Sequence, residues 1–217
     1  MGRPREFDID KAIETATELF WRKGYEGTSL SDLTGAMRIT APSLYFAFGN
    51  KEKLFRRVIE QYYERQKELF ESALREPTVR GVAQRFLYGY ADFLTDSSHA
   101  PGCLALNSSL PCAGGDAIRA WLANLRSELT VKLRKRFAQA RGTSEFPTHA
   151  DPDALARYIA VIAWGLAVEA QSGAKRKDLY GAITAGLAAW PAAAVSTQGQ
   201  RPVPNVRKMA SPRRRQQ

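Results

Sequence analysis

Apolar residues recur every three or four positions along almost the whole 217-residue chain, and no segment shows the strict alternation of a half-buried β-strand. In the first segment, Ile9, Ile13, Ala16 and Phe20 fall on one face of a helix. This pattern predicts an all-α fold. We expect helices over residues 8–23, 30–37, 51–75, 79–95, 103–110, 116–140, 153–171 and 178–190, with a shorter one between Thr40 and Gly49.

Residues that start and stop helices divide the first fifty positions. Ser29 is a good N-cap and has an aspartate three residues later, which is a capping-box pattern. Thr40 caps the short helix, and Pro42 in its first turn costs no hydrogen bond. A long helix followed by two short ones with a tight turn between them is the pattern of a helix-turn-helix.

In a helix-turn-helix the second short helix enters the major groove of DNA with its N-terminal residues at the base edges. The inward positions Leu44 and Phe48 would hold this helix against its neighbours. The same spacing also fits an ordinary small helical bundle. The residues at the helix start are small and would let the backbone approach DNA: Thr40, Ala41, Pro42 and Ser43.

Three motifs follow one another within residues 8–55: Ala-x-x-Leu-Phe, then Gly-Tyr-x-x-Thr-Ser, then Leu-Tyr-x-x-Phe-x-Asn-Lys-Glu-x-Leu. With these motifs the stretch resembles the DNA-binding domain of the TetR family of bacterial transcriptional regulators. The resemblance covers about a quarter of the chain densely. It implies a homodimer whose N-terminal domains bind a palindromic operator, and whose C-terminal domain binds a small molecule that changes the affinity for DNA.

The resemblance also implies roles for single residues. Thr28 or Ser29 would contact a phosphate at the start of the second helix, and Tyr45 and Lys51 would hold the DNA backbone. Thr40, Ala41, Pro42 and Ser43 would form the turn that faces the bases.

The chain departs from the family pattern at several of these positions. Arg38 stands where the family often has a glycine, so a positive φ there would cost on the order of 1 kcal/mol, which a phosphate contact could offset. Ala41, Pro42 and Ala47 replace larger polar residues. We therefore expect base readout to depend on Thr40, Ser43 and apolar contact with thymine methyl groups.

The positive charge of the chain is unevenly distributed. Residues 1–50 carry six Lys/Arg and seven Asp/Glu, whereas residues 195–217 carry six Lys/Arg and no acid. We interpret residues 195–217 as a disordered basic tail, either inert or adding sequence-independent affinity for DNA. Gly2 to Arg5 form either a minor-groove arm or a frayed terminus. The division is thus a DNA-binding domain over 1–50, a ligand-binding and dimerisation domain over 51–194, and the tail.

Several classes of protein are not supported by the sequence. No apolar run has transmembrane length and the N-terminus lacks a signal-peptide segment, so we expect a cytoplasmic protein without a membrane partner. His99 and His149 are far apart, and no motif for a metal, a cofactor or a catalytic group lies near either. We expect no enzyme activity, no metal and no cofactor.

The last two helices are too apolar for the surface of a monomer. They would form either buried core or a symmetric four-helix interface between two subunits. With the resemblance we favour the interface, built from small and apolar residues: Ala156, Ile159, Ala160, Ala163, Ala167, Ile183, Gly186, Leu187 and Trp190.

Aromatic residues between residue 51 and these helices are candidates for the wall of a ligand pocket, although aromatics at helical spacing also suit a core. A pocket of this kind would take an apolar or aromatic molecule of unknown identity. The candidates are Tyr62, Phe86, Tyr90, Phe93, Leu104, Asn107, Trp121, Leu125 and Trp164.

The function expected from these features is a homodimeric repressor released from its operator by a small ligand. Two alternatives stay open. One is a redox-sensing regulator that acts through Cys103 and Cys112, and the other is an architectural DNA binder that responds to no ligand.

Overall fold

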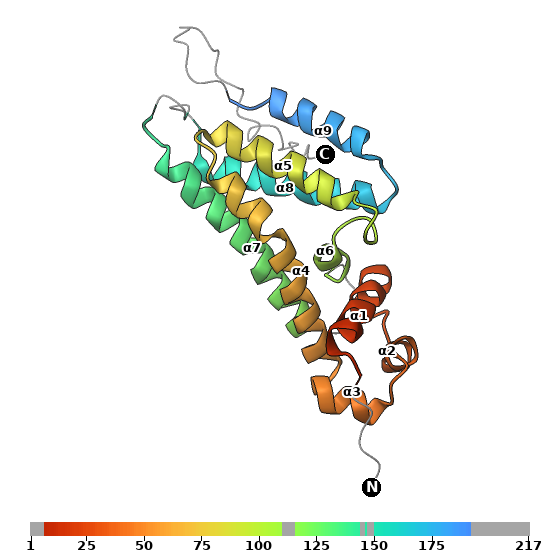
Figure 1. Cartoon of the computed structure of the whole chain (residues 1–217). Coiled ribbons are helices and arrows are strands. Elements are labelled where there is room, and N and C mark those ends of the chain that lie inside the picture. The colour runs from red at the N-terminus through yellow and green to blue at the C-terminus, as the bar shows by residue number, and fades with distance from the viewer. Residues whose placement is uncertain (1–6, 110–115, 144–145, 147–149, 192–217) are drawn as a thin grey trace, which may run out of the picture.

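The computed structural model describes residues 7–109, 116–143, 146 and 150–191, and within these ranges the chain forms helices and connecting segments without a strand (Figure 1). The all-α prediction is confirmed, and helix bounds agree with the expected ones to within a few residues. Four predicted features lie outside the described residues: the Gly2–Arg5 arm, Cys112, His149 and the basic tail. The helices are α1 (Ile9–Lys23), α2 (Leu30–Met37), α3 (Ala41–Phe48), α4 (Lys51–Leu74), α5 (Val79–Leu94), α6 (Leu104–Asn107), α7 (Asp116–Gln139), α8 (Pro152–Gln171) and α9 (Arg176–Ala188).

The predicted caps form at the starts of the short helices. The Ser29 side chain accepts a hydrogen bond from the backbone N–H of Asp32, and the Asp32 side chain accepts one from that of Ser29, which completes a capping box. The Thr40 side chain accepts from the N–H of Ser43 at the start of α3. Each cap satisfies backbone donors that an isolated helix end leaves open, so α2 and α3 are stable despite having eight residues each.

Two apolar cores lie along the molecule, and α4 takes part in both. This long helix runs from the end that holds α1, α2 and α3 to the end that holds α5, α8 and α9 (Figure 1). The first lies among α1, α2, α3 and the start of α4, and includes the fully buried Phe20, Leu33 and Leu44. It continues along α4 as far as Tyr62 and takes up residues of α6 and α7, including Leu104. The helix-turn-helix domain is therefore held to the rest of the chain by continuous packing rather than by a linker.

The second core joins α5, α7, α8 and α9 to the end of α4. The residues expected at the dimer interface lie mainly in this core, and the structure corrects that prediction. Inside the protomer they pack against the other helices and leave almost no surface for a second subunit. Eight of the nine are buried, namely Ala156, Ile159, Ala160, Ala163, Ala167, Ile183, Leu187 and Trp190, while Gly186 lies against Tyr158 and Ile162.

A different set of small and apolar residues faces outward on the same two helices. On α8, Val161 and Val168 are about half exposed, and Gly165 has open space where a side chain would stand. On α9, Gly181 has open space as well, and Ala182 and Ala185 are exposed. A hydrogen bond of 2.6 Å from the Tyr158 hydroxyl to the Gly186 carbonyl holds α8 and α9 side by side.

No helix in the described ranges is both long and apolar enough to cross a lipid bilayer.

Candidate DNA-binding surface and effector pocket

The exposed start of α3 brings together the four residues expected to face the bases. Thr40, Ala41 and Pro42 are exposed and Ser43 is partly exposed, and the Thr40 and Ser43 hydroxyl oxygens lie 2.9 Å apart. Leu44 and Phe48, on the opposite side of the helix, are buried in the first core. The core thus fixes α3 while its small N-terminal residues stay free for a partner.

The two candidates for a phosphate contact at the start of α2 differ in accessibility. Thr28 is fully buried, and its hydroxyl donates a 2.7 Å hydrogen bond to the carbonyl of Gly24, so the structure excludes it from direct contact with DNA. Ser29 is exposed. Beside it, hydrogen bonds from Lys23 and from Ser29 hold the pKa of the Asp32 carboxyl well below its ordinary range, and Lys23 balances that charge at 2.9 Å. Ser29 is therefore the candidate that remains on this helix.

Arg38 has the left-handed conformation, with φ of 54°, as the C-cap of α2. The resembling family often has a glycine at this position. Residues with a Cβ rarely adopt this backbone conformation. Its backbone N–H donates to carbonyls of the last turn of α2, which fixes the turn before α3.

Replacing Arg38 by glycine and by alanine separates backbone strain from loss of the guanidinium. Both variants lose the same charge, but only glycine relieves the left-handed backbone, so Arg38→Gly should be more stable than Arg38→Ala by about 1 kcal/mol. Urea unfolding followed by circular dichroism measures the difference. Equal stability of the two variants would show that this turn is not strained.

Tyr45 and Lys51 offer two side chains suited to the DNA backbone. Tyr45 is 46% exposed, so its hydroxyl is accessible. Lys51 opens α4, where the helix dipole adds positive potential, and its ammonium lies 4.3 Å from the centre of the Tyr25 ring. Burial lowers the pKa of Lys51, and the nearby Glu26 partly opposes that shift.

Sequence reasoning missed Phe46. Its side chain is 93% exposed, the most exposed large apolar residue among those the structure describes, and it lies on the same helix as the base-facing residues. The signal was present, because Phe46 is two residues from both Leu44 and Phe48 and therefore lies on the opposite side of α3.

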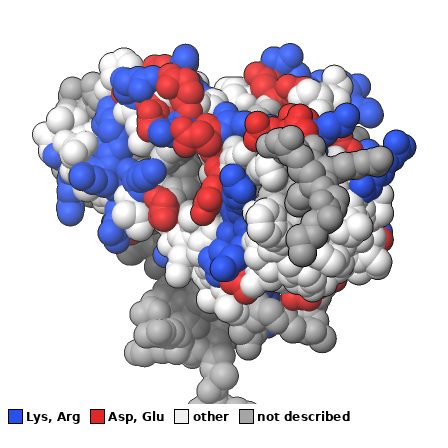
Figure 2. Space-filling model, turned by 60° about the horizontal axis from the view of Figure 1, so that its bottom comes forward, with Lys and Arg blue, Asp and Glu red and all other residues white. Residues whose placement is uncertain are grey.

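The surface at this end of the molecule carries both signs of charge. Figure 2 shows Lys and Arg side chains interleaved with Asp and Glu and with uncharged areas, rather than one continuous basic patch. This agrees with the near-zero charge of residues 1–50. Contacts with DNA must therefore come from individually placed groups more than from a general positive field.

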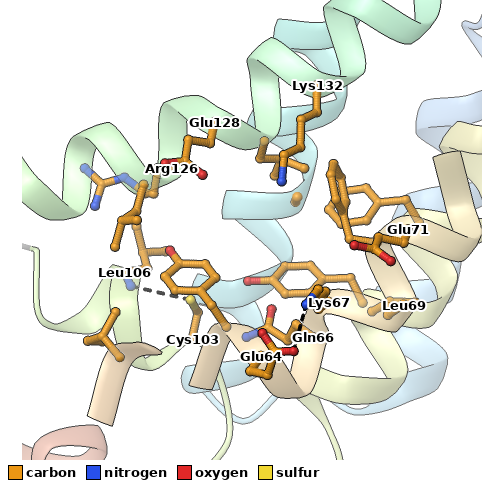
Figure 3. A pocket seen from close by; sticks show the side chains of 18 of the residues that line it. Glu64, Gln66, Lys67, Leu69, Glu71, Cys103, Leu106, Arg126, Glu128 and Lys132 are labelled. Carbon is orange, nitrogen blue, oxygen red and sulfur yellow. Dashed lines mark hydrogen bonds and ion pairs between the residues drawn. The ribbon is translucent and has the colours of Figure 1, made fainter. Parts of the chain in front are cut away.

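A cavity of about 480 Å³ lies mainly between α4 and α7, with contributions from α5, α8 and the segment around α6 (Figure 3). Its size suits a small organic molecule. Five of the nine predicted pocket residues line it: Phe86, Tyr90, Trp121, Leu125 and Trp164. The other four lie outside it. Tyr62 and Leu104 are buried in the first core, Phe93 packs against the Trp21 and His99 rings, and Asn107 turns toward α1.

Charged side chains of α4 and α7 form part of the wall, and sequence reasoning missed them. Glu128 and Lys132 extend from α7 on one side, and Glu64, Lys67 and Glu71 lie on α4 across the cavity (Figure 3). Lys67 and Glu64 are 2.9 Å apart, and the Lys132 ammonium lies 5.7 Å from the centre of the Phe70 ring. The cavity is therefore aromatic with a charged margin, whereas the sequence predicted aromatic walls with few polar groups.

The wall of the cavity also contains a few hydroxyl and thiol groups. Cys103 lines it, and its sulfur accepts a hydrogen bond from the Tyr62 hydroxyl at 3.1 Å. Tyr63 and Tyr90 also line it, and burial raises the pKa of both phenols above the ordinary value, so they remain neutral donors. The described residues contain no cluster of His, Cys, Asp or Glu that could hold a metal ion.

Asn107 connects the region of the cavity to the DNA-binding domain. Its side-chain amide donates a 2.6 Å hydrogen bond to the carbonyl of Trp21, in the last turn of α1. Because α1 ends at Lys23, this carbonyl lacks a partner within its own helix. The short helix α6, which touches the cavity through its N-cap Cys103 and its own Leu106, thus caps α1.

Changing Asn107 should lower the free energy of unfolding by an amount that depends on the new side chain. Asn107→Ala leaves the Trp21 carbonyl unpaired and should cost about 1–3 kcal/mol, while Asn107→Asp should cost more because a carboxylate then faces a carbonyl at the negative end of α1. Urea unfolding measures both. Asn124→Asp on the exposed side of α7 is the control, expected to stay within about 0.5 kcal/mol of wild type. An aspartate at 107 as stable as asparagine would contradict the capping role.

A helix-turn-helix domain packed against a helical domain with a ligand-sized cavity defines a class: one-component DNA-binding regulators. Residues 12–58 match the model of the tetR family of bacterial regulatory proteins. The HTH-type transcriptional repressor ComR of Escherichia coli K12 is 34% identical over 195 residues, which cover 88% of this chain and 92% of ComR. The chain therefore belongs to the TetR family, and it is a transcriptional regulator rather than an enzyme.

Solved structures agree with this assignment. The TetR-family regulator CifR, as a cysteine mutant complexed with 26-bp double-strand operator DNA, is 34% identical with a TM-score of 0.81, over 87% of this chain and all of that one. A putative TetR regulator from Rhodococcus sp. RHA1 is 36% identical with a TM-score of 0.58, over 84% of this chain and 99% of that one.

Proposed function

We propose that this protein is a homodimeric repressor that binds a palindromic operator through α3 and is released by a small, largely apolar or aromatic ligand bound between α4 and α7. The observation that carries the proposal is the cavity of about 480 Å³ whose wall, α4, is the same helix that completes the core of the DNA-binding domain. Repression is favoured because ComR is named a repressor, and operator binding because CifR was solved on operator DNA. Such a protein acts in the cytoplasm, where the DNA is.

The dimer would form through the outward faces of α8 and α9. Val161, Gly165 and Val168 on α8 and Gly181 and Ala185 on α9 present small or apolar groups that let a second copy approach closely. Two helices from each subunit would then form a four-helix interface around a two-fold axis. A two-fold dimer matches two half-sites related by the same symmetry.

The ligand would act by shifting a population between two dimer shapes. Ligand in the cavity separates or tilts α4 relative to α7, and α4 and the Asn107–Trp21 hydrogen bond transmit this to the position of α3. To release most of the operator, the ligand must favour the non-binding shape by a few kcal/mol, about 5.5 kcal/mol for a change from 1:99 to 99:1. In the ligand-bound dimer, the two α3 helices would thus be wrongly spaced for successive major grooves.

Two measurements test the proposal. A gel shift with the upstream region of the protein's own gene, in low salt with competitor DNA, should show retardation, and its absence would count against operator binding. The uncharged aromatic probe N-phenyl-1-naphthylamine should bind once per protomer with increased fluorescence. Leu129→Trp, which adds volume to the cavity wall, should reduce the affinity for the probe by about tenfold or more. If the affinity were unchanged, the probe would bind outside this cavity.

A redox-sensing variant of this function is supported by one observation, the position of Cys103 in the cavity wall beside the Tyr62 hydroxyl. In that variant oxidation of Cys103 would replace ligand binding as the signal. Changing both Cys103 and Cys112 to serine tests the redox mechanism. If DNA binding still responds to an oxidant after the change, the redox mechanism through these cysteines is excluded. A selection from random DNA would separately distinguish a site-specific repressor from an architectural binder.

A further inference from the structure

The exposed side of α3 carries an aromatic ring that the fold does not use. At 3.6 residues per turn, a residue two positions from Leu44 and two from Phe48 lies about 160° from each around the helix axis. Both of those are buried, and Phe46 between them is 93% exposed. The ring therefore points directly away from the core, and removing it takes almost nothing from the folded state.

Phe46 continues the surface formed by the start of α3. Pro42 is one turn earlier on the same face, and Ser43 lies three residues before Phe46, so the three side chains are neighbours along the helix. The result is an apolar ridge of Pro42 and Phe46, bordered by the Thr40 and Ser43 hydroxyls that bond each other at 2.9 Å. No Lys, Arg, Asn or Gln lies within α3 to read bases by paired hydrogen bonds.

We propose that Phe46, supported by Pro42, is a specificity-determining residue that reads the 5-methyl groups of thymines in the major groove. The proposal rests on the operator binding proposed above. Among the groups at the floor of the major groove, the thymine methyl is the apolar partner that a phenyl ring fits best. Operator half-sites should therefore hold at least one thymine whose methyl group, rather than its hydrogen-bonding atoms, is required.

The position of the ring separates this role from that of an intercalating wedge. Apolar wedges that unstack base steps enter from the minor groove and kink the duplex. Phe46 lies on the second helix of a helix-turn-helix, next to the small N-terminal residues that bring this helix into the major groove. It meets base edges and not the stacked faces of a base step.

The test uses the full chain and a duplex obtained by selection from random DNA. Each thymine of the half-site is replaced in turn by deoxyuridine, which lacks only the methyl group. Wild type should lose about fourfold in affinity at one or two symmetric positions, as expected for one buried methyl. Phe46→Ala should bind the thymine duplex about tenfold more weakly and should show no further loss with deoxyuridine, whereas Phe46→Leu should keep part of the methyl dependence.

Each outcome bears on one claim. Val131→Ala, which shortens a half-exposed apolar residue of α7, should bind like wild type, and circular dichroism and the thermal midpoint should be unchanged in all variants. Phe46→Ala that binds as tightly as wild type, or that keeps the full deoxyuridine effect, overturns the role of Phe46 while leaving operator binding intact. Wild type that selects no sequence at all overturns the proposed function and this inference with it.

Discussion

Replacing Val161 by glutamate is expected to convert the proposed dimer into monomers without unfolding them. Val161 is 54% exposed on the outward face of α8, so the carboxylate is solvated in the monomer. In a two-fold interface the same carboxylate would be buried twice without a partner, which costs several kcal/mol. The dissociation constant of the dimer should rise by at least about 100-fold, and sedimentation velocity measures it.

Two further glutamates make this test specific to the face of α8. Val131→Glu on α7 changes a residue of similar exposure, 47%, and should leave the dimer intact. Ala163→Glu puts the charge at a position that is 1% exposed in the second core and should prevent folding rather than dimerisation. If Ala163→Glu instead gave a folded monomer, that result would support the dimer interface predicted from the sequence.

Loss of the proposed dimer should also lower the affinity for the operator. In the proposed dimer, two α3 helices would bind two half-sites with a high effective concentration, which contributes about 10²–10⁴ in affinity. Val161→Glu should therefore bind the full operator about 100-fold or more weakly, although its α3 is unchanged. A fluorescence anisotropy titration measures the loss, and a single half-site duplex, bound equally by wild type and variant, is the control.

The ends of the helices could be predicted from the sequence because capping acts locally. Ser29, Thr40 and Asn50 each satisfy N–H groups within the next three residues, so the signal requires no knowledge of the tertiary fold. The positive φ of Arg38 was indicated by the family resemblance instead, since the family often has a glycine at this position.

The orientation of α8 and α9 could not be predicted in this way. Nearly all sides of these helices carry alanine, glycine, valine or isoleucine, so periodicity does not indicate which face is buried. The residues chosen for the interface were the inward ones, such as Ile159 and Ile183. The aromatic residues of the cavity wall could be predicted from the sequence, but its charged residues could not. Glu64 and Lys132 resemble ordinary surface residues in the sequence, and only the packing of α4 beside α7 brings them to the cavity.

Phe55→Ala should destabilise the protein more than any other truncation to alanine considered, because Phe55 joins the two domains. Its ring is fully buried, and its centre lies 5.0 Å from that of Phe20, 4.8 Å from that of Tyr25 and 6.4 Å from that of Trp121. Truncation leaves a cavity among α1, α4 and α7 and should cost about 3–5 kcal/mol. A domain of this size has a total stability of about 5–15 kcal/mol, so the variant should be marginally folded in urea titrations.

Phe46→Ala is the matched control, since the chemical change is identical and the environment is opposite. The free energy of unfolding should stay within about 0.5 kcal/mol of wild type, because a ring that is 93% exposed contributes little to the core. Phe55→Ala should lower stability and leave intrinsic contact with DNA intact where it is folded, while Phe46→Ala should do the reverse. If both variants lost similar stability, Phe46 would be part of a packed surface, and its exposure could no longer be attributed to contact with DNA.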